Sequence, residues 1–350
     1  MTTARVVRFN HWISPIFGTR LAEEKDISLD VLDMLGSDEA AWSALAQAHV
    51  YQITAAVNEL SPQYRVNAQL LERCPALLCV SSSGAGHDTV DVEACTKAGV
   101  AVVNQIGGNA PAVAEMAIGL MLAVSRRIAE SDRILRSARG FSRESLMGHD
   151  IGGMTLGIVG IGNTGMRTAR LAKAFGMRVL AVDPHVCAED IRNRGAEPVS
   201  LDQLVHLADI ISVHCPSDAT TRNLFDARRF ESMKRGAIFV STARGGIHDE
   251  AALFEALVSG HLSGAGLDVW AIEPPPLDHL LLTLPNVVAT YHTAGVSHEA
   301  RANVGAMAAE QIVGLVRGVT PPRLANPKVW DAFSARYQHT FGKKFVAALA

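Results

Sequence analysis

GIVGIGNTG, residues 157–165, is the most informative stretch of this sequence. It overlaps the end of an apolar, strand-like run, Met154–Val159, and precedes a helix-like run, Met166–Phe175. A glycine-rich turn between a strand and a helix is typical of a dinucleotide-binding unit, whereas the same glycines without that setting carry little information. We therefore predict a turn that holds a pyrophosphate at the start of a helix.

The three glycines of the turn have different expected tasks. Gly160 permits the tight turn, Gly162 lets the backbone approach a pyrophosphate, and Gly165 lets the helix pack closely on the strand. The amides of the first helical turn have no partners inside the helix, and they point at the phosphates with the positive end of the helix dipole.

An acidic residue ends the next strand-like run. Arg178–Val182 is followed by Asp183, at the distance along the chain where a carboxylate binds the ribose hydroxyls of the adenosine. Because an anion there repels a 2′-phosphate, we expect NAD(H) as the cofactor in preference to NADP(H). A glycine-rich turn that binds nothing is the alternative, and Asp183 argues against it.

Composition narrows the class of protein. The chain has 350 residues, 48% hydrophobic and 19% charged, with a net charge of −3, which fits an ordinary globular protein of two domains. Without a basic stripe, nucleic-acid and anionic-membrane partners are not expected. The five cysteines contain no C-x-x-C pair and the first residues have no apolar signal core, so we expect free thiols and a cytoplasmic protein.

Strand-like and helix-like runs alternate after the fingerprint, and this alternation predicts an α/β fold. The helix-like runs are Leu201–Leu207, Ala227–Met233 and Glu250–Ser259. The strand-like runs are Arg178–Val182, Ile210–His214, Ala237–Thr242, Gly264–Val269 and Val287–Thr290. Continuous apolar strands joined by helices indicate a Rossmann-type, doubly wound parallel sheet covered on both faces. Ligands of such sheets bind beyond the carboxyl ends of the strands.

A second, smaller α/β domain is expected upstream, of flavodoxin-like type. Its strands are Val6–Phe9, Val50–Ile53, Leu77–Val80 and Val100–Val103, and Ala40–Gln47 and Val92–Ala98 are helix-like. We expect one long helix over Ala112–Ala129, and Glu299–Val316 to return the chain to this domain. The predicted division is 1–105 with 298–335 as substrate domain, 106–297 as NAD-binding domain and 336–350 as a tail, with the ligand between the two lobes.

Three titratable side chains follow predicted strands of the larger sheet. Arg244 lies in STARGG, Glu273 in LDVWAIEPP and His292 in YHTAG. One such residue alone is usually a surface charge or a structural histidine. Three at equivalent ends of neighbouring strands indicate a site. No His, Cys or carboxylate cluster has metal-ligand spacing, so we expect no metal.

These blocks also carry a resemblance. Together with SGAGHDTVDVEA, NAPAVAEMAIGLML and ISVHCPSDATTRN, they make the chain similar to the D-isomer-specific 2-hydroxyacid dehydrogenases from about residue 75 to 316. This family includes glyoxylate/hydroxypyruvate reductases, D-lactate dehydrogenases and D-3-phosphoglycerate dehydrogenase. The first 70 residues and the tail match it only loosely.

The resemblance implies roles for the three titratable residues. Arg244 would bind the carboxylate and carbonyl oxygen of a 2-oxo acid, because a guanidinium offers two parallel donors and stays charged. His292 would exchange a proton with that carbonyl oxygen as hydride is transferred, since imidazole changes its protonation near neutrality. Glu273 would pair with His292, favour the imidazolium and fix its orientation.

Other positions follow from the same resemblance. Ala85 and Gly86 would offer amides to the substrate carboxylate, and Asp268 would orient the nicotinamide carboxamide. Gly295 would keep the chain after the histidine near the cofactor. The remaining expected cofactor contacts are Asn163 and Thr164 at the pyrophosphate, Cys215 at the adenosine, and Thr242 and Ala243 at the nicotinamide.

The family further implies a homodimer joined through the cofactor domains, in which Ala112–Val124 covers the partner, although core burial explains that run equally well. The expected activity is the interconversion of a small D-2-hydroxy acid and its 2-oxo acid. No basic cluster that would indicate a phosphorylated substrate appears around Trp12–Phe17 or Gln52–Leu60. We therefore expect a small acid such as glyoxylate, hydroxypyruvate or pyruvate as the substrate. The alternatives are an NAD-sensing corepressor and a phosphite or formate dehydrogenase relative. The formate enzymes lack the equivalent of Glu273.

Overall fold

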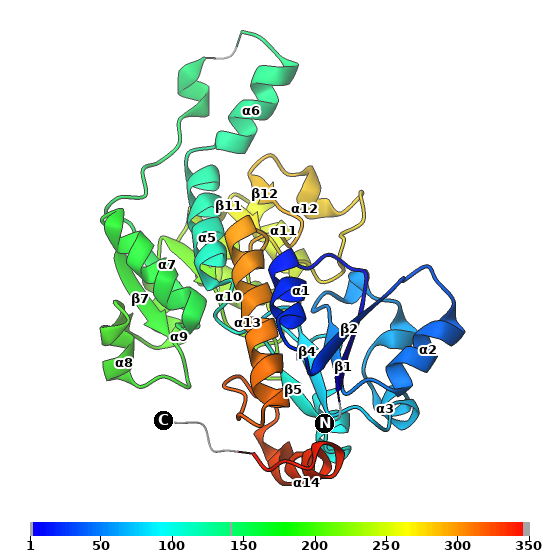
Figure 1. The fold of residues 1–350 in the computed structure, drawn as a ribbon. Helices are drawn as coiled ribbons and strands as arrows, with labels where there is room; N and C mark the ends of the chain where they lie inside the picture. Colours follow the sequence, from blue (N-terminus) through cyan, green and yellow to red (C-terminus); the bar gives the residue numbers. More distant parts are fainter. Residues whose placement is uncertain (1–2, 141, 346–350) are drawn as a thin grey trace. The chain divides into compact units, whose positions relative to one another are not determined.

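The computed structural model describes residues 3–140 and 142–345, and it divides into two units. The first unit comprises Met1–Asn109 and His298–Ala350, and the second comprises Ala110–Ser297. Figure 1 shows that each unit is a sheet flanked by helices, and α/β is therefore confirmed as the fold class. No described helix is both long and apolar enough to cross a membrane.

The second unit contains a seven-stranded parallel sheet in the order β12-β11-β10-β9-β6-β7-β8. Its strands are β6 (Thr155–Val159), β7 (Arg178–Val182), β8 (Glu197–Pro198), β9 (Ile210–Val213), β10 (Ala237–Ser241), β11 (Leu262–Leu267) and β12 (Val287–Ala289). The chain reverses direction across the sheet between β6 and β9, where open α/β sheets bind their ligands.

Helices cover both faces of this sheet. They are α5 (Ala110–Ser125), α7 (Asn163–Ala174), α8 (Ala188–Asn193), α9 (Leu201–Leu207), α10 (Ala227–Glu231), α11 (Glu250–Val258) and α12 (Leu280–Thr283). One hydrophobic core lies under α5 and α7, and a second lies under α9, α10 and α11. Several helices begin where the sequence supplies a cap: Ser200 and Gln203 form a reciprocal capping box at α9, and Asp249 accepts two amides at α11.

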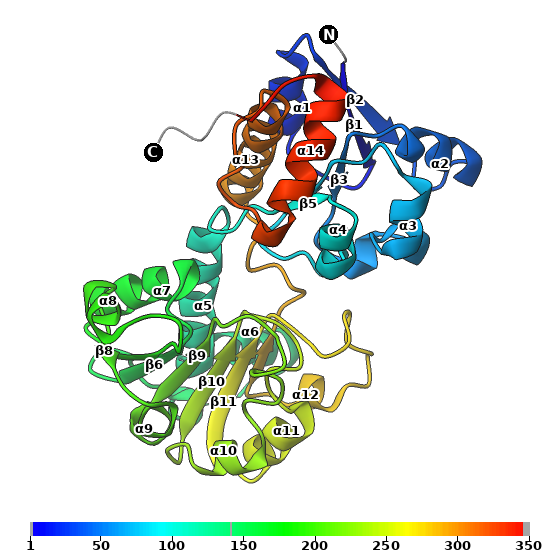
Figure 2. The same ribbon diagram turned by 90° about the horizontal axis from the view of Figure 1, so that it is seen from below.

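The first unit contains a five-stranded parallel sheet in the order β2-β1-β3-β4-β5, the order found in flavodoxin. Its strands are β1 (Ala4–Phe9), β2 (Ile27–Leu32), β3 (Val50–Ile53), β4 (Cys79–Ser82) and β5 (Ala101–Val103). Its helices are α1 (Pro15–Ala22), α2 (Asp38–Ala46), α3 (Ala68–Arg73), α4 (Val92–Lys97), α13 (His298–Val316) and α14 (Trp330–Phe341). Figure 2 shows α1 and α13 side by side on one face of the sheet.

Residues 336–345 of the predicted tail belong to this unit. Phe333 and Tyr337, one helical turn apart on α14, are fully buried beside α13, and the Tyr337 hydroxyl donates to the Val316 carbonyl over 2.7 Å. Residues 346–350 of that tail, like residues 1 and 2, lie outside the described part of the chain.

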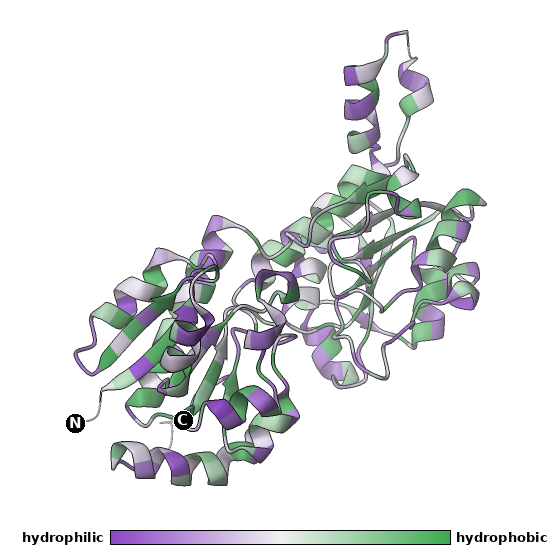
Figure 3. Ribbon diagram, turned by 90° about the vertical axis from the view of Figure 1, so that its right-hand side faces the viewer, coloured by the Kyte–Doolittle hydropathy of each residue, from purple (hydrophilic) through white to green (hydrophobic). Residues whose placement is uncertain are grey.

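The predicted single helix over Ala112–Ala129 is wrong, because it is divided in two. Helix α5 ends at Ser125, Arg127 takes a left-handed conformation (φ 52°), and α6 (Ile128–Ser137) begins anew. Helix α6 and a short 3₁₀ helix, η3 (Arg143–Leu146), form an arm that projects from the second unit (Figure 3). No described residue of α6 is buried.

Candidate active site

The fingerprint turn shows why each of its glycines is needed. Gly160 has a φ of 91°, and a Cβ there would lie 2.7 Å from the Cys215 amide nitrogen. A Cβ at Gly165 would lie 2.2 Å from the Gly160 carbonyl oxygen, so only glycine lets α7 pack this closely. At Gly162 a Cβ would meet nothing within 4 Å, and the start of α7 is left open to a ligand.

Asp183 lies at the carboxyl end of β7 and contacts the same turn. One carboxylate oxygen accepts the Ile161 amide over 3.0 Å, and the other accepts the His185 amide over 3.0 Å. The Arg194 guanidinium donates to the Ile161 carbonyl over 2.8 Å. The side chain is therefore fixed beside the glycine turn, while each carboxylate oxygen keeps room for a further donor.

The end of β9 completes this part of the site. Cys215 is partly buried, and burial raises its pKa to about 11, so its thiol is protonated at neutral pH. His214 is partly buried, and desolvation of its ring lowers its pKa to about 4. Its ring nitrogens lie 3.0 Å from the Ser212 hydroxyl and 3.4 Å from the Thr242 hydroxyl. An uncharged ring held in this way connects the ends of β9 and β10.

The loop after β10 carries Arg244. Its guanidinium donates to the Ala243 carbonyl over 2.8 Å, and Ala243 itself is 8% exposed. The next residue, Gly245, packs directly against the loop after β11, where a Cβ would lie only 1.9 Å from the Trp270 carbonyl oxygen. This close approach brings the arginine loop and the glutamate loop together.

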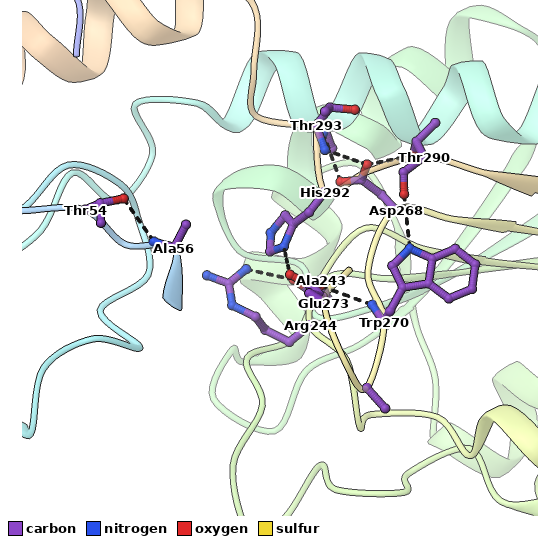
Figure 4. Close-up of polar contacts among 12 residues, drawn as sticks. Thr54, Ala56, Ala243, Arg244, Asp268, Trp270, Glu273, Thr290, His292 and Thr293 are labelled. Carbon is purple, nitrogen blue, oxygen red and sulfur yellow. Dashed lines mark hydrogen bonds and ion pairs between the residues drawn. The ribbon is translucent and has the colours of Figure 1, made fainter. Parts of the chain in front are cut away.

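His292 and Glu273 form an ion pair in the second unit (Figure 4). The His292 Nδ1 lies 2.6 Å from the Glu273 Oε2, while the Trp270 amide donates to the Glu273 Oε1 over 3.1 Å. Burial alone would raise the pKa of Glu273, but the bond from His292, the Trp270 amide and the charge of Arg244 together lower it. The carboxylate is thus ionised at neutral pH, and the Arg244 guanidinium lies beside the imidazole.

The backbone around the histidine is fixed by Asp268, which is fully buried. Its Oδ1 accepts the Thr290 hydroxyl (2.6 Å) and the Thr293 amide (2.8 Å), and its Oδ2 accepts the Ala294 amide (2.9 Å). The Asp268 carbonyl also accepts the His292 amide over 2.8 Å. These bonds hold His292 at a φ of 50°, which is costly for a side chain other than glycine.

A second histidine–carboxylate pair, which sequence reasoning missed, lies behind the first. Glu250, the first residue of α11, accepts the Ala271 amide over 2.7 Å and contacts the His279 Nε2 over 3.2 Å. The rings of His279 and Trp270 meet edge to face. The pair therefore supports the segment between Trp270 and Glu273. Its only sequence signal is the acidic residue at the start of a predicted helix.

Asn163 and Thr164 are the first two residues of α7, and the remaining predicted residues lie in loops. Ala85 and Gly86 follow β4 in the first unit, are partly exposed, and their amides have no partner among the described residues. The Gly86 carbonyl accepts the Ser82 hydroxyl over 2.6 Å, which orders this loop. Gly295 lies in the turn closed by the bond from the Val296 amide to the Thr293 carbonyl. No cluster of potential metal ligands occurs among residues 3–140 and 142–345.

Comparison with known proteins identifies the family. The sequence model of the D-isomer specific 2-hydroxyacid dehydrogenase, NAD binding domain, matches residues 118–294. The chain belongs to this family. Its second unit contains the NAD-binding domain of an oxidoreductase, and NAD is its cofactor. The glycine turn open at Gly162 and the fixed carboxylate of Asp183 fit that group.

Individual relatives cover different shares of the chain. A D-3-phosphoglycerate dehydrogenase of Archaeoglobus fulgidus is 42% identical over 257 residues, which are 73% of this chain but only 49% of that protein. A glyoxylate reductase of Korarchaeum cryptofilum is 39% identical over 75% of this chain and 80% of its own length. The crystal structure of the TT0316 protein of Thermus thermophilus superposes with a TM-score of 0.80 and 33% identity, covering 92% of this chain and 99% of its own.

Proposed function

We propose that the chain interconverts a small D-2-hydroxy acid and its 2-oxo acid with NAD(H). The observation that carries the proposal is the orientation of His292. Its Nδ1 is occupied by Glu273, which leaves Nε2 as the ring atom for a reacting oxygen, and the Arg244 guanidinium lies beside it. A proton donor next to a fixed cation is what reduction of a 2-oxo acid requires.

NAD(H), when bound, would supply the hydride that reduces the carbonyl carbon. Arg244 binds the carboxylate and carbonyl oxygen of the acid, and its positive charge stabilises the negative charge that develops on that oxygen. His292 donates its Nε2 proton to the same oxygen, and Glu273 stabilises the imidazolium that makes this transfer possible. In the direction of oxidation, the same nitrogen takes the hydroxyl proton back.

The proposed binding contacts follow the predicted residues. The amides of Asn163 and Thr164 at the start of α7 bind the pyrophosphate, and Asp183 binds the ribose hydroxyls. Thr242, Ala243, Cys215 and Gly295 border the cofactor, and the amides of Ala85 and Gly86 donate to the substrate carboxylate. Asp268 has one acceptor position left on Oδ2 for the carboxamide, because three donors already occupy its other main positions.

The test is NADH oxidation measured with glyoxylate, hydroxypyruvate and pyruvate, and repeated with NADPH. We expect turnover with at least one acid, a D-configured product from hydroxypyruvate or pyruvate, and a preference for NADH. Absence of turnover with every 2-oxo acid, in a protein shown to bind NADH, would overturn the proposal. A tenfold preference for NADPH would contradict only the role of Asp183.

We also propose a homodimer formed through the second unit. The arm presents apolar side chains to solvent, with Ile128 54%, Leu135 68% and Met147 71% exposed. Its contacts with the body of its own unit include one bond from Arg133 to the Pro285 carbonyl over 2.6 Å. Sedimentation should give a mass of two chains, and Leu135→Lys should shift it towards one. A wild-type monomer at micromolar concentration contradicts the dimer.

A further inference from the structure

Three adjacent strands of the first unit carry a polar residue at the same level of the sheet. Residues Arg8, Gln52 and Ser81 are paired in register across β1, β3 and β4, and we call them the polar layer. Two positions earlier, the same three strands carry Val6, Val50 and Cys79, which belong to the hydrophobic core beneath α1 and α13. Since side chains two residues apart share a face, the polar layer continues that core towards the carboxyl ends of the strands.

The polar layer is buried but not internally satisfied. Gln52 and Ser81 have no exposed surface. Both polar atoms of the Gln52 amide, the Ser81 hydroxyl and the Arg8 Nε have no hydrogen-bond partner among the described residues. A buried polar group without a partner costs about 1–3 kcal/mol, so three neighbouring residues in this state need an explanation.

Two further side chains extend the layer. The Arg8 Nη1 donates to the His11 carbonyl over 2.9 Å, and both ring nitrogens of His11 are buried without partners. Arg301, in the first turn of α13, lies with its guanidinium carbon 5.8 Å from the centre of the Trp12 ring, and its Nε is also buried without a partner. These groups lie beside the end of β1.

The cluster is rich in donors and carries positive charge. Burial first, and then the charge of Arg8 with a smaller effect of Arg301, lowers the pKa of His11 to about 4 against the opposing charge of Glu59, so the ring is neutral at pH 7. Glu59 is exposed and accepts the Thr54 hydroxyl over 2.6 Å. Neither guanidinium has a carboxylate within ion-pair distance among residues 3–140 and 142–345.

We propose that the polar layer, with His11 and Arg301, is a binding site for a small oxyanion, a carboxylate or a phosphate. The two guanidinium Nε–H groups, the Gln52 amide and the Ser81 hydroxyl supply donors, and an oxyanion supplies the acceptors and the opposite charge. A cation would be repelled by the two guanidinium groups. Water would satisfy the donors, but it would not neutralise the charge. The position also agrees with the edge at which open α/β sheets bind ligands.

Calorimetric titration of the full chain with inorganic phosphate and with succinate, at constant ionic strength, tests the site. We expect one saturable site per chain, weakened about tenfold or more in Gln52→Leu and in Arg301→Gln. Arg20→Gln is the matched control, because Arg20 is an exposed arginine of α1 that pairs with Glu23. Absence of saturable binding by the wild type, or equal binding by all three variants, overturns the proposal.

Thermal unfolding of Gln52→Leu separates binding from a structural role. Replacement of an unpartnered buried amide by an apolar side chain of similar size should leave the unfolding temperature unchanged or raise it. The same variant should bind the anion more weakly. If Gln52 instead served the packing of the first unit, the variant would unfold at a lower temperature and still bind the anion, which contradicts the proposal.

The oxyanion has two chemical sources, a second acidic group of the substrate or a free anion, and kinetics distinguish them. If the oxyanion belongs to the substrate, Arg301→Gln lowers kcat/KM about tenfold for a 2-oxo diacid. It does not lower kcat/KM for a 2-oxo monoacid of equal length whose side chain is uncharged. If it is a free anion, the variant treats both acids alike, and phosphate binds together with either. Failure of every 2-oxo acid to react would remove the proposed function, while the titration still decides the anion site.

Discussion

The carboxyl edges of the two sheets differ in whether their polar side chains have hydrogen-bond partners. In the second unit, Asp268 accepts three hydrogen bonds and Glu273 accepts two, so these groups are oriented before any ligand arrives. In the first unit, Gln52 and Ser81 are as buried as Asp268, but their polar side-chain atoms have no hydrogen-bond partner among the described residues. A site that performs proton transfer gains from fixed geometry, whereas a site that holds a ligand keeps its hydrogen-bonding capacity for that ligand.

The largest effect is expected from the removal of His292, the proposed proton donor of the second unit. His292→Asn should lower kcat for reduction by about 10²- to 10⁴-fold, because an asparagine amide cannot replace the imidazole as a proton donor to the carbonyl oxygen. The measurement is steady-state NADH oxidation, with NADH affinity as the control that should stay within twofold. A loss below tenfold would show that the ordered edge is not where the proton is transferred.

The second largest effect is expected from Glu273→Gln, which removes the negative charge next to His292. In the wild type, the pKa of Glu273 lies below its ordinary value of 4.5, so the carboxylate acts at all higher pH values and its effect is lost only as the pH falls through the lowered pKa. In Glu273→Gln the His292 ring loses the negative charge that accepts from its Nδ1. Reduction at pH 7 should fall about 10- to 100-fold, and its optimum should move to lower pH. An unchanged pH–rate profile contradicts the pairing role.

Asp268→Asn addresses the difference between the two edges directly. An asparagine offers a single carbonyl oxygen, so at least one of the Thr293 and Ala294 amides would face an NH₂ group. We expect the free energy of unfolding to fall by about 1–3 kcal/mol, measured in urea, whereas Gln52→Leu should not lower it. If both variants lost the same free energy of unfolding, the proposed difference in hydrogen bonding between the two sheet edges would be wrong.

The smallest effect is expected from Glu250, which supports the proposed catalytic pair of His292 and Glu273 from the neighbouring helix. Glu250→Ala removes the acceptor of the Ala271 amide, which loosens the segment that carries Glu273. Reduction should slow about two- to tenfold without a change in NADH affinity. Glu250→Gln keeps that acceptor and should recover most of the rate. If both variants behave alike, the amide bond is not what positions the segment.

Much of the second unit was predictable from the sequence, because its strands are continuous apolar runs that alternate with helices. Arg178–Val182 and Leu201–Leu207 have the predicted bounds, and the other predicted strands differ only at their ends. The early end of α5 was not predictable. It depends on a distant segment, since the His149 amide donates to the Ser125 carbonyl and a Cβ at Gly148 would lie 2.3 Å from that oxygen.

The first unit was predicted less completely. Strand β2 was missed, because it is an edge strand whose residues are only partly buried, and ISLDVL has no continuous apolar run. The polar layer was invisible for another reason. Arg8, Gln52 and Ser81 are far apart in the sequence, and only strand order and register bring them together. Likewise, sequence placed Arg244, Glu273 and His292 at strand ends, but the approach of their loops at Gly245 required the structure.

That approach limits how the enzyme can be redesigned. Since the backbone at Gly245 touches the Trp270 carbonyl, any larger residue there must displace the strand end from which Glu273 follows. In the proposed mechanism, a change in the 243–246 loop that admits a new acid therefore also displaces the segment that carries Glu273. The proposed selectivity for the acid and the proposed proton transfer are thus coupled at Gly245. Substitutions meant to change only one of them should be made elsewhere in the chain.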